Sequence, residues 1–277
     1  MSILTYAERE GRSGRAAILG LMLAGCGAEN GAEGDRGPDS AKESGTVLPT
    51  DGPYIQGELG GCFLPETDAG VEPMQVLGKG LELPAIRFSP PDGQDPSAVL
   101  VMLHQTDGDR CGWGDFATLA ALQGVAGLSF DLCGYGDADC GIKDPDDPVP
   151  QVQAALSEVE KQWPDVPMVL VGASMGGSQT VRAVAAGVDV DGWVDLSGPS
   201  NWAGVDLASV ADSISTPGLI AVAEDTDGPE EADAAQALAQ ATSSEFVPAE
   251  AGHGWELVVE EGRLTPLGQQ ILTYATS

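Results

Sequence analysis

Short apolar runs alternate with helix-like segments from about residue 74 to the end of the chain. The runs at 98–104, 125–131 and 167–172 have the composition of strands buried on both faces of a sheet. The segment 150–163 instead gathers its apolar side chains on one helical face: Val152, Ala155, Leu156, Val159 and Trp163. Strands that alternate with such helices predict an α/β fold, with a mostly parallel sheet and helices on both faces.

The remaining segments extend this pattern. Two strands joined by a Gly-Lys-Gly turn are expected in 74–90, and further strands in 191–198, 218–225 and 244–250. Helices are expected in 115–124, 176–187, 230–241 and 265–275. Residues 197–217 are long enough for one helix and a loop, which is too short for a large cap domain over the sheet.

The N-terminal part of the chain has a different character. Arginines precede an apolar run at 16–25 that is too short for a permanent membrane span, so we expect residues 1–25 to be a signal peptide. The following Gly/Ala/Ser-rich and acidic residues, 26–53, cannot bury enough apolar surface to fold and predict a flexible tether. The folded domain is therefore expected to span 54–277.

The end of the apolar run carries a further signal. Its last residues, Leu23 to Cys26, read LAGC and resemble the lipobox of bacterial lipoproteins. This resemblance implies that Cys26 is lipidated and anchors an exported protein to a bacterial membrane, facing the periplasm or the cell surface. A plain secretory signal followed by an incidental cysteine is the alternative.

The charge balance restricts the partners. With 43 acidic and 12 basic residues, the formal net charge is -31. Such a charge argues against nucleic acids and anionic lipid surfaces, because both are polyanions. The lipid on Cys26 is then the expected membrane contact, and the sequence leaves the oligomeric state open.

Four cysteines remain in the expected domain. In an oxidising compartment Cys62, Cys111, Cys133 and Cys140 permit two disulfides, with three possible connectivities. Because Cys133 and Cys140 bracket a short loop, we expect them to pair, which leaves Cys62 to attach the N-terminal segment to Cys111. No CxxC motif or Cys/His pair indicates a metal site, and we expect neither a metal nor an organic cofactor.

The sequence VLVGASMGG, residues 169–177, places Ser174 between a strand and a helix, with Gly172 and Gly176 two positions away on either side. A sharp strand-to-helix turn holds a serine in a strained conformation, and glycines relieve crowding across it. The free N–H groups of the helix N terminus then lie near the serine oxygen. This pattern predicts a nucleophile exposed above the sheet.

A serine nucleophile needs a base and an acid. The only histidines are His104, at the end of an apolar run, and His253, in a glycine-flanked loop before the last helix. The loop position favours His253 as the base. Asp225 and Asp227 both follow the apolar run GLIAV, residues 218–222, and are candidates for the acid; we prefer Asp227, because the residue after the tight turn normally faces the histidine.

The order Ser, Asp, His on these strands and loops resembles the α/β-hydrolase superfamily, in particular serine esterases and dienelactone hydrolases. The resemblance covers about 74–277 and rests on VLVMLHQTDG, LSFDLCGYGDAD, GASMGG, AEDTD and GHG. It implies that the backbone N–H of Met175 and that of Gln105 or Thr106 form the oxyanion hole, and that His104 shapes the loop that follows it. The superfamily has His-Gly where this chain has His104-Gln105.

The expected function is hydrolysis of carboxylic esters through an acyl-enzyme on Ser174. A peptidase or acyltransferase on the same fold is the enzymatic alternative, and a catalytically silent surface-binding lipoprotein is the alternative from another class. Without a cap the site should be open to water. The acidic side chains of Asp107, Asp109, Asp137 and Asp139 are expected near its mouth, and they favour small neutral or cationic esters.

Overall fold

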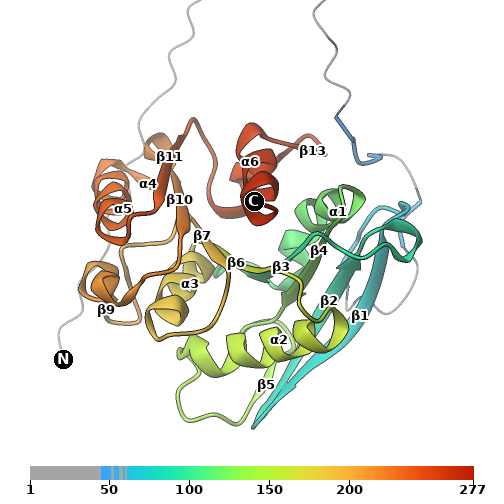
Figure 1. Cartoon of the computed structure of the whole chain (residues 1–277), viewed down its shortest axis with the longest axis horizontal. Helices are drawn as coiled ribbons and strands as arrows, with labels where there is room; N and C mark the ends of the chain where they lie inside the picture. The colour runs from blue at the N-terminus through green and yellow to red at the C-terminus, as the bar shows by residue number, and fades with distance from the viewer. Residues whose placement is uncertain (1–44, 51–52, 56–58, 60) are drawn as a thin grey trace, which may run out of the picture. The chain divides into compact units, whose positions relative to one another are not determined.

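The computed structural model describes residues 45–50, 53–55, 59 and 61–277. In this part of the chain, the main sheet has nine strands in the order β1-β2-β4-β3-β6-β7-β10-β11, with β5 paired to β2 (Figure 1). The strands are β1 (Gly70–Gly78), β2 (Leu81–Ser89), β3 (Ala98–Leu103), β4 (Val125–Phe130), β5 (Asp139–Cys140), β6 (Met168–Ala173), β7 (Gly192–Leu196), β10 (Gly218–Ala223) and β11 (Glu245–Ala249). All neighbouring strands from β4 to β11 in this order are parallel, and β1, β2 and β5 form antiparallel pairs. The predicted mostly parallel sheet is confirmed.

Helices cover both faces of the sheet, as expected for parallel strands. Val99, Val101 and Leu103 of β3 face a core that includes side chains from α2, α3 and α5. Ala98, Leu100 and Met102 face the opposite core, which contains side chains from α1 and α6. The helices are α1 (Gly114–Leu122), α2 (Pro148–Gln162), α3 (Met175–Ala185), α4 (Glu224–Asp227), α5 (Pro229–Thr242) and α6 (Pro266–Ala275).

Smaller elements connect these layers. There are five 3₁₀ turns within the described residues: η1 (Pro91–Gly93), η2 (Arg110–Trp113), η3 (Leu207–Ser209), η4 (Ala211–Ser213) and η5 (Gly254–Leu257). Two short hairpins are formed by β8 (Asn201–Trp202) with β9 (Val205–Asp206), and by β12 (Val259–Glu260) with β13 (Arg263–Leu264).

The segment 197–217 differs from the expected helix and loop. It contains the β8–β9 hairpin followed by η3 and η4. Ala203 and Gly204 adopt φ values of 50° and 78°, and two consecutive positive φ angles form the turn that joins a tight hairpin. The segment thus contains a hairpin and two 3₁₀ turns where it has room for one helix and a loop, and the absence of a large cap in this segment is confirmed.

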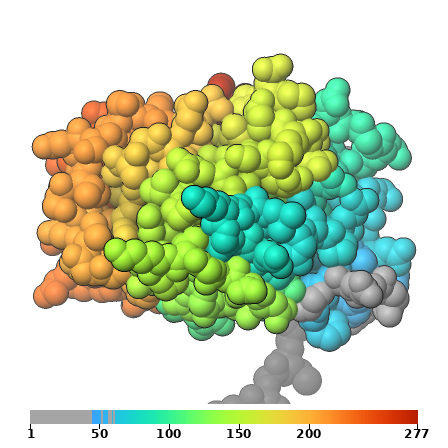
Figure 2. Space-filling model, turned by 90° about the horizontal axis from the view of Figure 1, so that it is seen from below, coloured from blue at the N-terminus to red at the C-terminus, as the bar shows by residue number. Residues whose placement is uncertain are grey.

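A second departure lies at the far end of the β1–β2 hairpin. The short strand β5 pairs with β2, and the N–H of Gly141 donates to the carbonyl oxygen of Gly80 at 2.8 Å. Figure 2 shows this end from below, with the cyan hairpin against the green segment that holds β5 and α2. The pattern of residues 139–140 gave no sign of this two-residue strand.

The folded unit extends further toward the N terminus than residue 54. Among the described residues it includes Leu48, which is only 4% exposed. The N–H of Leu48 donates to the carbonyl oxygen of Gly262 at 2.8 Å. Part of the expected tether 26–53 therefore packs on the domain. The expected signal peptide 1–25 and Cys26 lie outside the described residues.

Candidate active site

Ser174 lies between β6 and α3 and adopts φ 49° and ψ -117°, a conformation that a residue with a side chain rarely takes. The flanking glycines are required by close backbone approach. A Cβ atom on Gly172 would lie 2.0 Å from the carbonyl oxygen of Gly176, and one on Gly176 would lie 2.2 Å from that of Leu103. A side chain at Gly172 would therefore collide across the turn, as expected. A side chain at Gly176 would instead collide with the end of β3.

His253 precedes η5, and its Nδ1 lies 2.6 Å from Oδ1 of Asp227. The Asp227 side chain is 6% exposed and that of His253 is 35% exposed, so the carboxylate is buried behind a ring that reaches solvent. Asp225 is exposed, and its side chain makes no hydrogen bond or ion pair within the described residues. The structure thus places Asp227, and not Asp225, against the histidine.

Two further groups hold the Asp227 carboxylate. Its Oδ2 accepts hydrogen bonds from the hydroxyl of Ser197 at 2.8 Å and from the N–H of Ala223 at 3.1 Å. The one-turn helix α4 makes this arrangement possible, because it returns Asp227 to the end of β10. Sequence reasoning missed Ser197, whose only signal is its position directly after a buried strand.

The loop of His253 packs against the end of β6. A Cβ atom on Gly254 would lie 3.1 Å from the Cβ of Ala173, the residue that precedes Ser174. Within the described residues no hydrogen bond joins the Ser174 hydroxyl to His253. The base and the serine are therefore brought to adjoining backbone positions, at the carboxyl ends of parallel strands, where α/β proteins place their sites.

The N–H groups of Gln105, Thr106 and Met175 donate to no acceptor within the described residues. Met175 is the first residue of α3, and no side chain caps that helix N terminus. Unpaired donors at such an end attract negative charge. Sequence reasoning assigned the oxyanion hole to these residues, and their donors remain free for that role.

His104 is fully buried, and both of its ring nitrogens are engaged within the fold. Its Nε2 accepts the N–H of Leu132 at 3.0 Å, so Nδ1 carries the proton and donates to the carbonyl oxygen of Gln105 at 2.8 Å. Burial lowers the pKa of His104. This histidine is therefore a neutral part of the loop structure, in agreement with the expected shaping role.

Asp195 of β7 is a second buried carboxyl group near the site. It is 1% exposed and accepts the N–H of Gly198 at 2.8 Å. Burial raises the pKa of Asp195 to about 7, and the neighbouring charges of Asp227 and Glu231 act in the same direction. The sequence pattern placed Asp195 in a strand without assigning it a role.

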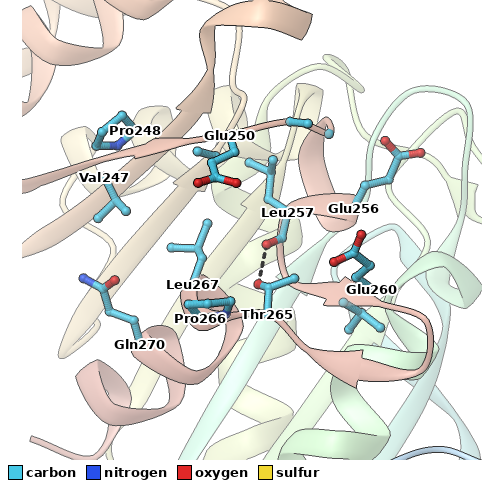
Figure 3. Close-up of a pocket in the computed structure, with 14 residues that line it drawn as sticks. Val247, Pro248, Glu250, Glu256, Leu257, Glu260, Thr265, Pro266, Leu267 and Gln270 are labelled. Atoms are coloured by element: carbon cyan, nitrogen blue, oxygen red, sulfur yellow. Dashed lines mark hydrogen bonds between the residues drawn. The ribbon is translucent and has the colours of Figure 1, made fainter. Parts of the chain in front are cut away.

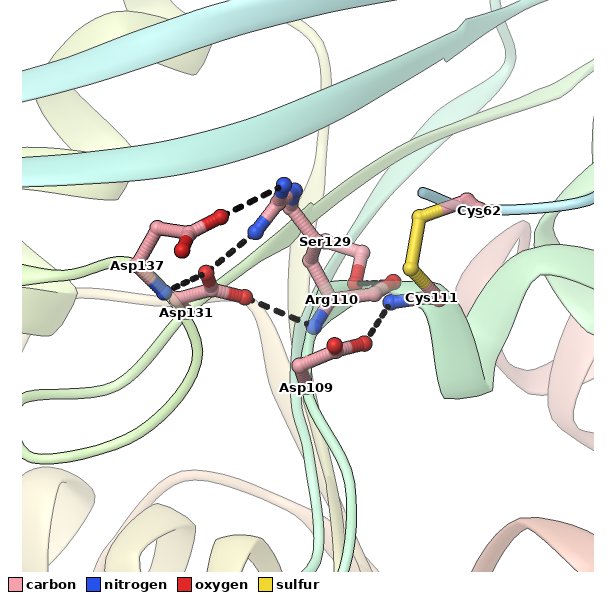
Figure 4. Close-up of a disulfide and its surroundings, with 7 residues drawn as sticks. All are labelled: Cys62, Asp109, Arg110, Cys111, Ser129, Asp131 and Asp137. Atoms are coloured by element: carbon pink, nitrogen blue, oxygen red, sulfur yellow. Dashed lines mark hydrogen bonds and ion pairs between the residues drawn. A yellow bond between two sulfur atoms is a disulfide. The ribbon is translucent and has the colours of Figure 1, made fainter. Parts of the chain in front are cut away.

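Both predicted disulfides are confirmed. Cys62 is bonded to Cys111 with Cα atoms 5.2 Å apart, and Cys133 to Cys140 with Cα atoms 5.8 Å apart. Figure 4 shows the buried ion pair of Arg110 with Asp131 that lies next to the Cys62–Cys111 bond.

The ion pair and its neighbours attach η2 to the end of β4. Asp131 also accepts the backbone N–H groups of Arg110 at 2.9 Å and Asp137 at 2.8 Å. Asp137, whose side chain is 75% exposed, lies within 3.5 Å of the guanidinium. The loop after β3 is therefore fixed by a disulfide and an ion pair together.

A cavity of about 600 Å³ lies between β11, η5 and α6. Its lining does not include Ser174, Asp227 or His253. Figure 3 shows the Glu250 carboxylate pointing into it between Leu257 and Leu267. The cavity thus lies behind the base loop and not at the serine.

The described residues contain no cluster of His, Cys, Asp or Glu that could hold a metal ion. Across the same residues, no helix is both long and apolar enough to cross a membrane.

Comparisons with known proteins identify the family of the chain and support its fold. The family model described as "Serine aminopeptidase, S33" matches residues 94–239, which include Ser174 and Asp227 and end before His253. No curated protein sequence matches the chain.

Several solved structures share the fold. An α/β serine hydrolase homologue from Coxiella burnetii has 20% identity and a TM-score of 0.56, covering 73% of this chain and 96% of the other. A dienelactone hydrolase from Anabaena variabilis has 17% identity and a TM-score of 0.58, with coverages of 75% and 97%. An esterase from Pyrococcus furiosus has 13% identity and a TM-score of 0.56, with coverages of 75% and 90%. Since the family model spans more than half of the chain, this protein is a serine hydrolase of the α/β-hydrolase superfamily and belongs to the serine aminopeptidase S33 family.

Proposed function

We propose that the protein hydrolyses carboxylic esters through an acyl-enzyme on Ser174, with His253 as general base and Asp227 as the acid of the triad. The observation that carries this proposal is the 2.6 Å contact between His253 Nδ1 and Asp227, next to a serine held at φ 49°. The contact fixes the histidine tautomer with Nε2 unprotonated, which is the form that accepts the serine proton.

The steps follow from this arrangement. Ser174 Oγ attacks the ester carbonyl carbon while its proton passes to His253 Nε2, and the buried Asp227 carboxylate stabilises the imidazolium. The N–H groups of Met175 and of Gln105 or Thr106 donate to the oxyanion. His253 then protonates the departing alcohol. Water, deprotonated by the same nitrogen, attacks the acyl group and releases the carboxylic acid and Ser174.

The surroundings favour small, soluble substrates. Only the β8–β9 hairpin, η3 and η4 lie between β7 and β10, which leaves the site without a large cap from this segment. The acidic loop residues Asp107, Asp109 and Asp137 and the net charge of -31 disfavour anionic substrates. We therefore assign short-chain neutral or cationic esters, with no activation at an oil–water interface.

A peptidase is the second candidate, and the description of the matching family model favours it. The same serine, histidine and oxyanion donors cleave an amide when the leaving amine receives the histidine proton. Acidic side chains near the mouth would attract a substrate with a free amino group. An acyltransferase would instead pass the acyl group to an acceptor other than water, and a silent surface-binding protein would show no turnover.

Kinetics of the full chain on matched chromogenic esters, amides and lactones test the proposal. Hydrolysis of short esters, with kcat/KM at least about 100-fold above that for the matched amides and lost in Ser174→Ala, is the expected result. A preference for aminoacyl amides would support the peptidase instead. Equal rates for Ser174→Ala and the wild type would refute both.

Export and anchoring are proposed separately. Two disulfides suit an oxidising compartment, and the LAGC sequence supports lipidation of Cys26. Metabolic labelling with a fatty acid should mark the wild type and not Cys26→Ala. Equal labelling of the two proteins, or no labelling of either, would contradict the anchor.

A further inference from the structure

The indole of Trp255 joins the loop of His253 to the loop that follows β3. Trp255 belongs to η5 and comes two residues after His253 in the chain. Its ring lies edge-on to that of Trp113 in η2, with centroids 6.1 Å apart and an interplanar angle of 74°. Two loops that are far apart in the sequence are thus in contact through one side chain.

Two glycines make room for this ring. A Cβ atom on Gly108 would lie 2.2 Å from Cη2 of Trp255, and one on Gly112 would lie 2.3 Å from the same atom. At both positions the three nearest atoms belong to the indole. Neither glycine adopts a positive φ, so the backbone conformation does not require glycine there. The indole therefore accounts for the absence of a side chain at both positions.

A second contact supports the first. A Cβ atom on Gly254 would lie 2.3 Å from Oε1 of Gln105. The Gln105 amide is oriented by its Nε2, which donates to Asp107 at 2.8 Å, and its Oε1 is buried without a hydrogen-bond partner in the described structure. The loop after β3 therefore contacts the base loop at the two residues that follow His253, through Gly254 and through Trp255.

The loop after β3 is the rigid partner in this contact. Cys111 is bonded to Cys62, and the Arg110–Asp131 ion pair attaches η2 to the end of β4. A displaced indole would therefore shift the base loop more easily than it would shift η2. The position of His253 then depends on where Trp255 is seated.

We propose that Trp255 is a positioning residue, which keeps His253 aligned with the oxyanion donors Gln105 and Thr106. This inference rests on the proposed function of that site. Trp255 acts through the two loops and has no assigned contact with the substrate. Because misplacement by about 1 Å can cost roughly 100-fold in rate, its loss should lower kcat and leave KM almost unchanged.

A double-mutant cycle tests the coupling in the full chain. Trp255→Ala removes the ring, and Gly112→Ala displaces it; each is expected to lower kcat by about 10- to 100-fold. Because the three atoms nearest to an alanine Cβ at 112 all belong to the indole, the double variant should be no slower than Trp255→Ala alone. Losses that add in the double variant, or that fall on KM alone, would overturn the proposal.

Trp163→Ala is the matched control, since Trp163 is a half-buried tryptophan against the opposite core, beside α2. It should leave kcat unchanged. If Trp255→Ala does not fold, Trp255→Phe replaces it in the cycle, because a phenyl ring is too short to reach both glycines. A loss of kcat in Trp163→Ala as large as in the Trp255 variants would mean that any lost indole has this effect, and would refute the specific role.

A structural readout separates this inference from the proposed function. Hydrogen exchange measured in the Ser174→Ala background needs no activity, so it decides the coupling even if no ester is hydrolysed. Trp255→Ala should raise exchange by about tenfold in residues 105–112 and in the base loop, and Trp163→Ala should not. Unchanged exchange in 105–112 would refute the coupling, whatever the kinetics of the wild type.

Discussion

The hydroxyl of Ser197 donates a 2.8 Å hydrogen bond to Oδ2 of Asp227, whose Oδ1 contacts His253. The two carboxylate oxygens therefore have different partners, and Ser197 fixes which oxygen faces the ring. Ser197→Ala should lower kcat by about tenfold, since a hydrogen bond to a charged group contributes roughly 1.5–3 kcal/mol and Ala223 still holds the carboxylate. Steady-state kinetics check this, and Ser197→Thr should retain most of the activity. A rate for Ser197→Ala equal to the wild type would show that Asp227 does not need this donor.

The contact geometry distinguishes the two candidate acids. Asp227→Asn should lower kcat by about 10³- to 10⁴-fold, because an amide does not hold the histidine in the required tautomer. Asp225→Asn should stay within about twofold of the wild type, since Asp225 is exposed and has no partner in the described structure. Side-by-side kinetics decide the matter; the assignment fails if Asp225→Asn alone is inactive.

His104 provides a further comparison. Both of its ring nitrogens are used inside the fold, so His104→Ala should affect loop geometry and leave more activity than His253→Ala.

Asp195 predicts a dependence of stability on pH. Its pKa is raised from 3.8 to about 7 in the folded protein by burial, then by Asp227 and Glu231. An acid whose pKa is raised by folding contributes stability that is fully present below pH 3.8. This contribution is lost as the pH rises to about 7. Asp195→Asn removes the titrating group, so the stability of this variant should not fall for this reason as the pH rises. The asparagine keeps an acceptor for the N–H of Gly198.

Thermal unfolding between pH 4 and 8 checks this expectation. The melting temperature of the wild type should fall relative to that of Asp195→Asn as the pH rises, with Asp225→Asn as the exposed control. Parallel profiles for the wild type and Asp195→Asn would mean that this carboxyl group titrates normally.

The two disulfides should differ in their contribution to stability. The Cys62–Cys111 bond closes a loop of 49 residues and the Cys133–Cys140 bond one of 7. Chain entropy then predicts losses of roughly 4 and 2 kcal/mol in the free energy of unfolding when each is removed. Denaturant unfolding of the paired Cys→Ser variants measures the difference. The reverse order would contradict the entropic account.

Substrate charge offers a test of the acidic surroundings. At low salt, kcat/KM for a carboxylated ester should be about tenfold below that of its neutral analogue. At high salt the ratio of the two values should approach one, because ions screen the repulsion between the acidic protein and the carboxylate. A preference for the carboxylated ester, or a rate that rises once a long-chain ester exceeds its solubility, would contradict the substrate assignment.

The parts of the fold that the sequence predicted are those with strong periodicity. Apolar runs predicted the buried strands β3, β4 and β6. The glycines on either side of Ser174 predicted the sharp turn, because their positions have no room for a side chain. The β8–β9 hairpin could not be anticipated, because its turn uses Ala203 in a positive-φ conformation that alanine does not signal. Leu48 lies in a segment whose composition predicts a tether, since a single apolar residue gives no pattern.

Tertiary contacts set the same limit at the site. Asp227 could be preferred over Asp225, but the sequence predicts only a loop where α4 presents Asp227 to His253. Ser197, Asp195 and Trp255 act through residues distant in the sequence, so no local spacing marks them.

Labelling with a fluorophosphonate, followed by peptide mass spectrometry, tests the central claim most directly, because the reagent reacts with an activated serine and ignores a silent one. The full chain should acquire one adduct, located on the peptide that contains Ser174. Labelling should disappear in Ser174→Ala and slow by at least about 10³-fold in His253→Ala. An unlabelled wild type, or an adduct that persists in Ser174→Ala, would contradict the assignment of Ser174 as the nucleophile.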